Sequence, residues 1–170
     1  MKTWMKVALL TAICALPAMV LGRIIWPPAL DSPVPSSGQM PFFIILAACE
    51  ALAFGLGVSF LAFGLSLVRR LRAAGLPRWL ALVTYLSAGW LLVSWWPHDN
   101  LHIHTGEDLQ GLLYIEYGFH VTLMVAGGIV AYSFLSLVRD TSEQAAPSSA
   151  TTPTKATTPT VTTTAHSGSV

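Results

Sequence analysis

The stretch WWPHDNLHIHTGEDLQGLLYIEYGFHVTLMVAGG, residues 95–128, joins a short polar segment to the start of an apolar run. It holds four of the five histidines and four of the eight acidic residues of the chain. The apolar run continues to residue 138 with one charged residue, Glu116, and a bilayer-spanning helix needs about 20 residues. The stretch therefore predicts a membrane helix that begins beside a group of chemically versatile side chains.

The composition of the whole chain indicates the same class of protein. Hydrophobic residues make up 54% of its 170 residues and charged residues only 10%, whereas soluble domains carry about 25% charged residues. Four apolar runs predict an all-α integral membrane protein, a four-transmembrane-helix bundle with helices at 4–22, 41–68, 76–96 and 106–138. Residues 1–140 would form this domain, and the Thr/Ser/Pro-rich residues 141–170 are predicted to be a disordered tail.

The positions of the basic residues predict the orientation in the membrane. Lys2 and Lys6 precede the first helix and four arginines fall within residues 69–78, whereas the connections at the opposite end contain only Arg23. Because cytoplasmic loops are enriched in Lys and Arg, both termini are predicted to be cytoplasmic. The protein is then a multi-pass cell-membrane protein whose histidine-rich loop is extracytoplasmic. A cleaved signal peptide is the alternative for residues 4–22, although no clean small-x-small cleavage site follows them.

Two of the predicted helices carry faces suited to close packing. Small residues recur on one face of the first helix at Thr11, Ala15, Ala18 and Gly22, which lets another backbone approach. In the second helix, Glu50 shares a side with small residues, and a carboxylate does not favour contact with acyl chains. We therefore expect Glu50 to face other helices. The Pro- and Ser-rich residues 27–41 between these helices predict a strap without regular structure.

Counting along the helices places several polar residues at one height. Glu50 and His120 each lie sixteen positions before the serine of an SLVR sequence, at Ser66 and Ser136. The helical rise puts both about 27 Å above the ends of their helices, and His98 reaches a similar height from the third helix. Glu116 is one turn from His120. The predicted metal ligands are therefore Glu50, His98, His102, His104, Glu116 and His120.

Imidazole and carboxylate groups without thiolate suit a transition-metal ion such as Zn, Cu or Fe. The spacing of Glu116 and His120 allows two ligands from one helix, and His102 and His104 would add ligands from an extended loop. Four alternatives remain open: solvated loop histidines, a hydrogen-bonded Glu116–His120 pair, a packed and protonated Glu50 bonded to a neighbouring helix, and haem b bound between His98 and His120. No nucleophile motif or phosphate-binding loop is present, so the sequence does not indicate whether the protein is an enzyme.

These residues predict a protein of metal handling or redox assembly that is embedded in the lipid bilayer. Two further functions are compatible with the sequence: an accessory subunit of a larger membrane complex or a homo-oligomer without metal, and a component of proton relay or transport. Nucleic acid is not an expected partner, because no basic stripe with interleaved aromatic residues is present. Cys14 and Cys49 are expected at different heights, as small core residues without a disulfide.

Overall fold

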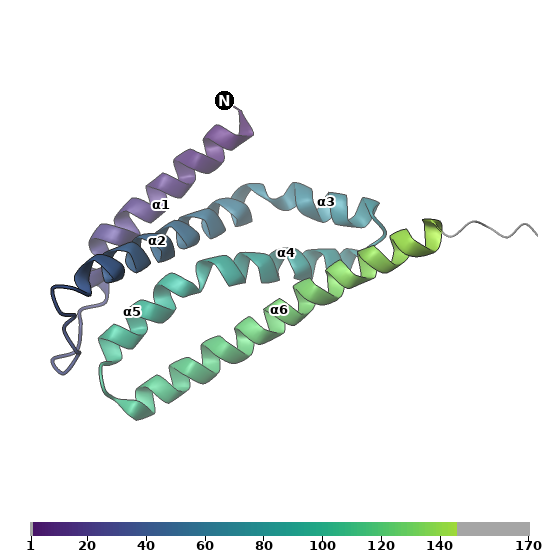
Figure 1. Ribbon diagram of the computed structural model, residues 1–170. Coiled ribbons are helices and arrows are strands. Elements are labelled where there is room, and N and C mark those ends of the chain that lie inside the picture. Colours follow the sequence, from purple (N-terminus) through teal and green to yellow (C-terminus); the bar gives the residue numbers. More distant parts are fainter. Residues whose placement is uncertain (1, 146–170) are drawn as a thin grey trace, which may run out of the picture.

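The structure is a computed structural model that describes residues 2–145. All regular elements in this range are α-helices (Figure 1). They are α1 (Thr3–Ile25), α2 (Met40–Phe63), α3 (Leu65–Ala73), α4 (Arg78–Val93), α5 (Trp95–Thr105) and α6 (Leu109–Ala145). The predicted all-α class is thus confirmed for the described residues.

Three helices are long and apolar enough to cross a membrane: α1, α2 and the part of α6 up to Arg139. Helices α4 and α5 meet the same criteria only as a pair, which is bent by 42°. The protein therefore has three candidate spans, or four if the bent pair counts as one. The exact four-span bundle and the side on which the termini lie remain predictions.

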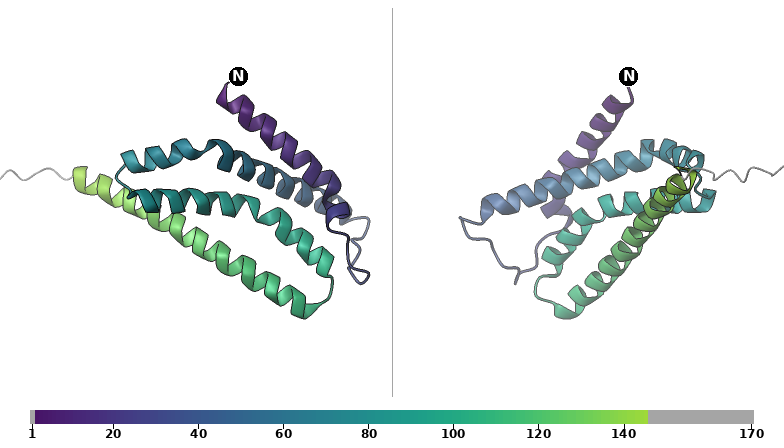
Figure 2. Two further views of the ribbon diagram at one scale, coloured as in Figure 1. Left: turned by 180° about the vertical axis from the view of Figure 1, so that it is seen from behind. Right: turned by 45° about the vertical axis from the view of Figure 1, so that its right-hand side comes forward.

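The helices form an open row in which each packs on the next (Figures 1 and 2). Helix α1 packs on α2, α2 packs on α4 and α5, and these two pack on α6. Among the described elements, α6 contacts neither α1 nor α2. The bent pair α4–α5 consequently separates two interfaces, one facing α1 and α2 and the other facing α6.

The predicted small face of α1 is confirmed as its contact surface. The buried residues of α1 are Thr11, Ala15, Ala18 and Gly22. The Thr11 and Ser59 hydroxyl groups are 3.0 Å apart across the interface. A Cβ atom at Gly55 would lie 2.5 Å from the Thr11 carbonyl oxygen, so α2 needs glycine there to approach α1. Cys14 and Cys49 are both free, and Cys49 is exposed on the surface of the chain, contrary to the expected core position.

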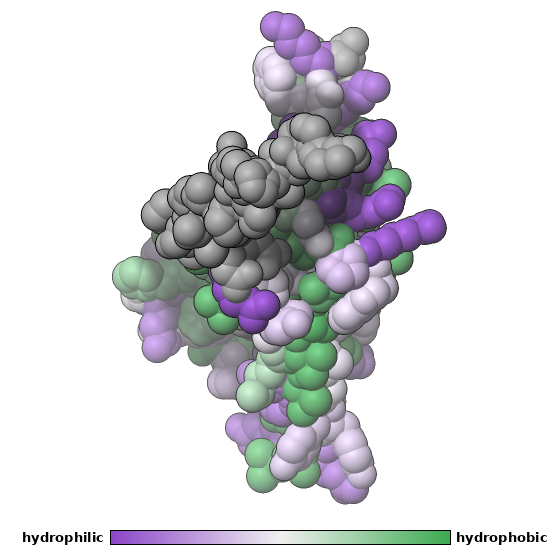
Figure 3. Space-filling view, turned by 90° about the vertical axis from the view of Figure 1, so that its right-hand side faces the viewer, coloured by the Kyte–Doolittle hydropathy of each residue, from purple (hydrophilic) through white to green (hydrophobic). Residues whose placement is uncertain are grey.

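The predicted single helix 41–68 is wrong at its C-terminal end, because α2 stops at Phe63 and α3 begins at Leu65. The Tyr85 hydroxyl donates to the Leu61 carbonyl, with the Phe60 carbonyl also within 3.4 Å. A side chain that inserts into the backbone hydrogen-bond ladder is a known cause of a helix break. The four arginines of residues 69–78 are exposed at this end of the row, which faces the viewer in Figure 3, where hydrophilic side chains project outward.

The predicted helix 76–96 is also divided, and the residues predicted to form a histidine loop are helical. Helix α4 ends at Val93, and α5 runs from Trp95 to Thr105. Pro97 has no N–H to donate to the Val93 carbonyl, which accounts for an interruption at this point. The same proline is tolerated in α5 because it lies in the first turn, where backbone N–H groups lack intrahelical partners.

The predicted start of the last helix is displaced by three residues, from 106 to Leu109. The Asp108 carboxylate caps the helix by accepting the backbone N–H groups of Gln110 and Gly111, both at 3.1 Å. At its other end α6 continues to Ala145, beyond the predicted boundary at residue 140. The remainder of the predicted tail, residues 146–170, lies outside the described residues.

The segment between α1 and α2 folds as the predicted strap, against the end of α5. The Ile103 carbonyl accepts hydrogen bonds from the Ala29 N–H at 3.1 Å and from the Ser32 hydroxyl at 2.7 Å. The Asp31 carboxylate accepts the Glu107 N–H at 3.3 Å. The strap therefore covers the end of the row where α5 turns into α6, opposite the arginine-bearing end (Figure 1).

Candidate metal centre

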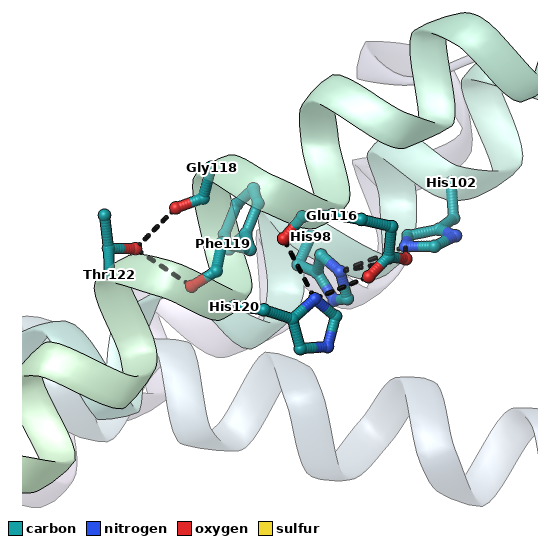
Figure 4. A network of polar contacts seen from close by, with 7 residues as sticks. All are labelled: His98, His102, Glu116, Gly118, Phe119, His120 and Thr122. Atoms are coloured by element: carbon teal, nitrogen blue, oxygen red, sulfur yellow. Dashed lines mark hydrogen bonds and ion pairs between the residues drawn. The ribbon is translucent and has the colours of Figure 1, made fainter.

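Two helices each contribute a pair of polar residues one turn apart, facing each other across the α5–α6 interface. His98 and His102 lie on α5, and Glu116 and His120 lie on α6. Residues four apart on a helix project from the same face. Because α5 and α6 are consecutive helices that pack on each other, the two pairs come together across their interface (Figure 4).

The Glu116 carboxylate is the centre of the group. Its Oε1 atom lies 2.6 Å from Nε2 of His102 and 3.8 Å from Nε2 of His98. Its Oε2 atom lies 2.5 Å from Nδ1 of His120. Figure 4 shows the three imidazole rings arranged around this one carboxylate.

The contacts among the rings indicate which nitrogen atoms carry protons. Nδ1 of His120 donates to the Glu116 backbone carbonyl at 3.0 Å, which leaves its Nε2 lone pair uncommitted in the neutral ring. Nε2 of His102 is 3.0 Å from Nε2 of His98. A carboxylate can only accept, so His102 donates its Nε2–H to Glu116, and the lone pair of His98 Nε2 accepts from the same N–H group. A metal ion bound to His98 and Glu116 would take the place of this His102 proton.

Aromatic rings enclose one side of the group. The Phe119 ring lies 4.7 Å from that of His98, and the Trp90 ring stacks on Phe119 at 5.9 Å. The indole N–H of Trp90 donates to the Thr122 hydroxyl at 3.1 Å, which fixes the stack to α6. On the open side, the side chain of His120 is 57% exposed, compared with 13% for His98. The group is therefore packed behind His98 and accessible beside His120.

The spacing of the ligand atoms is close to that of a metal site. His98, Glu116 and His120 each offer one ligand atom within 4.8 Å of the other two. Two atoms bound to one Zn ion at about 2.0–2.1 Å can lie at most about 4.2 Å apart. Small side-chain rotations would close that difference. Two histidines and one carboxylate fit a Zn ion with one open position, or a non-haem Fe(II) centre.

The geometry favours a metal ion over haem between His98 and His120. The two rings are 5.5 Å apart and both contact the Glu116 carboxylate, at 3.8 Å and 2.5 Å. Axial ligands of a haem must lie on opposite faces of a flat macrocycle. A carboxylate that reaches both rings occupies the space that the macrocycle would need.

The structure does not bring Glu50 into the group, although its side chain is buried against other helices as expected. Glu50 lies on the far side of α5 and interacts with Asp99, which is next to His98 in the chain. Helix α5 lies between them, because α2 packs on one of its sides and α6 on the other. The height predicted to be shared by Glu50 and His120 therefore did not bring their side chains together, because they lie on different sides of α5.

His104 also lies apart from the group. Its Nδ1 atom donates to the Pro27 carbonyl at 2.8 Å, and its ring packs edge-on against Trp26 at 6.3 Å. It fastens the strap to the end of α5. The prediction that His102 and His104 bind together from a loop fails, because residues two apart on a helix point in different directions. The His98–His102 spacing was the signal that sequence reasoning missed.

Comparisons with known proteins give no match: no family model, no curated protein and no solved structure resembles this chain.

Proposed function

We propose that this protein is a membrane protein that binds one transition-metal ion, Zn, Cu or Fe, through His98, Glu116 and His120. The observation that carries the proposal is the convergence of these three ligand atoms from two helices to within 4.8 Å. His102 contacts both Glu116 and His98 and is either a fourth ligand or the partner that orients them. The roles that fit such a site are metal handling and redox assembly.

Three features support metal binding over a purely structural cluster. The donor atoms are imidazole nitrogens and carboxylate oxygens, without thiolate or thioether sulfur. Zn, Cu and Fe ions accept this set of ligands. The group leaves His120 accessible, so an ion can enter and a further ligand can bind. Ionisable residues within or beside membrane helices are costly to bury, and four of them gathered at one point are a feature of functional sites.

The arrangement of charge along the row supports an extracytoplasmic position for this site. The arginines of residues 69–78 lie at the end of the row opposite the α5–α6 turn (Figure 1). Because arginine-rich connections prefer the cytoplasm, the metal site would face outward, on the same side of the membrane as the strap. A metal ion could then reach it without crossing the membrane.

Metal analysis of the purified full-length protein tests the proposal. After loading with Zn, Cu or Fe(II) and removal of unbound ions, we expect about one ion per chain. The variant His98→Ala/His120→Ala should retain none, and His104→Ala should retain as much as the unaltered protein. Equal retention by the double variant and the unaltered protein would refute the assignment.

A second candidate function is a subunit of a larger membrane assembly, and the exposed face of α6 favours it. Cβ atoms built at the adjacent Gly127 and Gly128 would meet nothing within 4 Å, so another helix could approach α6 closely at this point. Gly127→Leu/Gly128→Leu should dissociate such an assembly, as measured by its mass in a mild detergent. An unchanged mass would exclude this face as the contact.

A further inference from the structure

Helix α3 is a short basic helix at the end of the row opposite the metal centre. It begins at Leu65, directly after the break that ends the candidate span α2. Three of its nine residues are arginines, and a fourth arginine, Arg78, is the first residue of α4. Arginine stays protonated in proteins. Four permanent positive charges therefore lie within residues 69–78, at the end of the molecule shown in Figure 3.

The two sides of α3 differ in character. Val68 and Leu71 pack against the buried cluster around the start of α4. Leu65, Arg69 and Arg72 recur at intervals of four and three residues, so they project from one side of the helix, and all three are exposed. Helix α3 is therefore held to the protein by one side and presents a basic side outward.

The described part of the chain does not neutralise these arginines. Residues 64–79 include no acidic residue. No carboxylate that the structure describes lies within 4 Å of any of the four guanidinium groups, since the described ion pairs join histidines to Glu116. The positive charge of this surface is therefore available to an anionic partner.

Exposed apolar side chains accompany the arginines. Trp79, next to Arg78, is 65% exposed, and Leu65 is 61% exposed. Tryptophan is enriched where spanning helices meet the lipid headgroups. Arginine can cover apolar surface with its stem while its charged end reaches the polar layer. This combination fits the boundary between acyl chains and headgroups.

We propose that the arginine surface, formed by Leu65, Arg69, Arg72, Arg78 and Trp79, binds the headgroups of anionic phospholipids. The guanidinium groups would donate paired hydrogen bonds to phosphate oxygens, and the leucine and tryptophan would contact the upper part of the acyl chains. Clusters of about four to eight basic residues beside a membrane helix are typical of anionic-lipid recognition. An acidic protein segment would match the charge but not the two exposed apolar side chains.

Native mass spectrometry of the full-length protein in detergent tests this lipid preference. Delipidated protein is titrated at low ionic strength with phosphatidylglycerol or with phosphatidylcholine that has the same acyl chains. Each arginine near an anionic surface raises affinity by about fivefold. We expect phosphatidylglycerol to bind at least about 25-fold more tightly than phosphatidylcholine, as two or more arginines contribute.

Three variants test whether the preference belongs to α3. Arg69→Gln/Arg72→Gln should lower the affinity for phosphatidylglycerol by about 25-fold and leave that for phosphatidylcholine unchanged. Lys2→Gln/Lys6→Gln is the matched control, because it removes two exposed positive charges at the start of α1, and it should keep the preference. Arg69→Lys/Arg72→Lys keeps both charges and should retain most of the affinity, which separates loss of charge from loss of fold.

Equal affinities of the unaltered protein for the two lipids would overturn the proposal and point to an acidic protein segment as the partner. A preference that survives in Arg69→Gln/Arg72→Gln would overturn it as well, since the anionic lipid would then bind elsewhere. Glycerol phosphate carries the charge without acyl chains. If it displaced phosphatidylglycerol at equal concentration, the surface would be a site for small anions and not for lipid. These titrations involve no transition metal, so their outcome is separate from that of the metal centre.

Discussion

Replacing Glu116 by glutamine is the sharpest perturbation of the metal centre, because it keeps the shape of the side chain and removes its charge. The carboxylate contacts all three imidazoles, at 2.5, 2.6 and 3.8 Å. Glutamine has one oxygen to accept and one NH₂ group that can only donate. It can therefore satisfy one imidazole N–H, and it presents a donor to the other.

The effect of this substitution can be estimated as a loss of stability for the metal-free site and as a loss of metal affinity for the metal-bound site. Without metal, one charge-assisted hydrogen bond disappears, a contribution of about 1.5–3 kcal/mol when buried. Because the Glu116 side chain is 36% exposed, about 1 kcal/mol is a better expectation. With metal, loss of a group that supports a ligand typically lowers affinity 10–100-fold. Loss of a charged ligand should cost at least about 100-fold, or about 2.8 kcal/mol.

Competition with a chromophoric zinc chelator measures this change in affinity on the full-length protein in detergent. Glu107→Gln is the matched control, since it removes an exposed acid from the neighbouring turn. We expect Glu116→Gln to weaken Zn binding at least about 100-fold and Glu107→Gln to leave it unchanged. Affinities of the two variants within about threefold of each other would refute the role assigned to Glu116.

Three further predictions follow from the same contacts. His102→Ala should lower Zn affinity by about 10–100-fold, whereas His104→Ala should leave affinity unchanged and cost at most about 1 kcal/mol of stability, through loss of its bond to the strap. Zn affinity should fall as the pH is lowered, by roughly tenfold or more per unit below about pH 6, because protons compete for the imidazole nitrogens. A Zn affinity that does not change with pH in competition titrations would contradict histidine ligation. Gly57→Ala places a methyl group 2.5 Å from Val93 Cγ1 and should destabilise the protein by about 1–3 kcal/mol in thermal unfolding, while Gly127→Ala meets nothing within 4 Å and should not.

Periodicity predicted the parts of the fold that depend on one helix at a time. The small face of α1 is its buried face because side chains three and four residues apart project together, whatever the partner. The pairing of Glu116 with His120 follows from the same rule and needs no tertiary information. The apolar runs likewise predicted where the candidate membrane helices lie, though not where they break.

Tertiary contacts decided what the sequence left undetermined. The break after Phe63 depends on the Tyr85 hydroxyl, which comes from another helix. The position of Glu50 could not be derived from height alone, because α5 lies between it and the histidines. His98 and His102 form a pair only because residues 95–105 are helical, and a polar segment with a proline near its start resembles a loop.

X-ray absorption at the metal edge tests the central claim most directly, since it reports the atoms that surround the ion. For the Zn-loaded full-length protein we predict nitrogen and oxygen neighbours at about 2.0–2.1 Å, with the outer-shell scattering of at least two imidazole rings. That scattering should be lost in His98→Ala/His120→Ala. A first shell that contains sulfur, or one made only of oxygen without imidazole scattering, would contradict the metal centre described for α5 and α6.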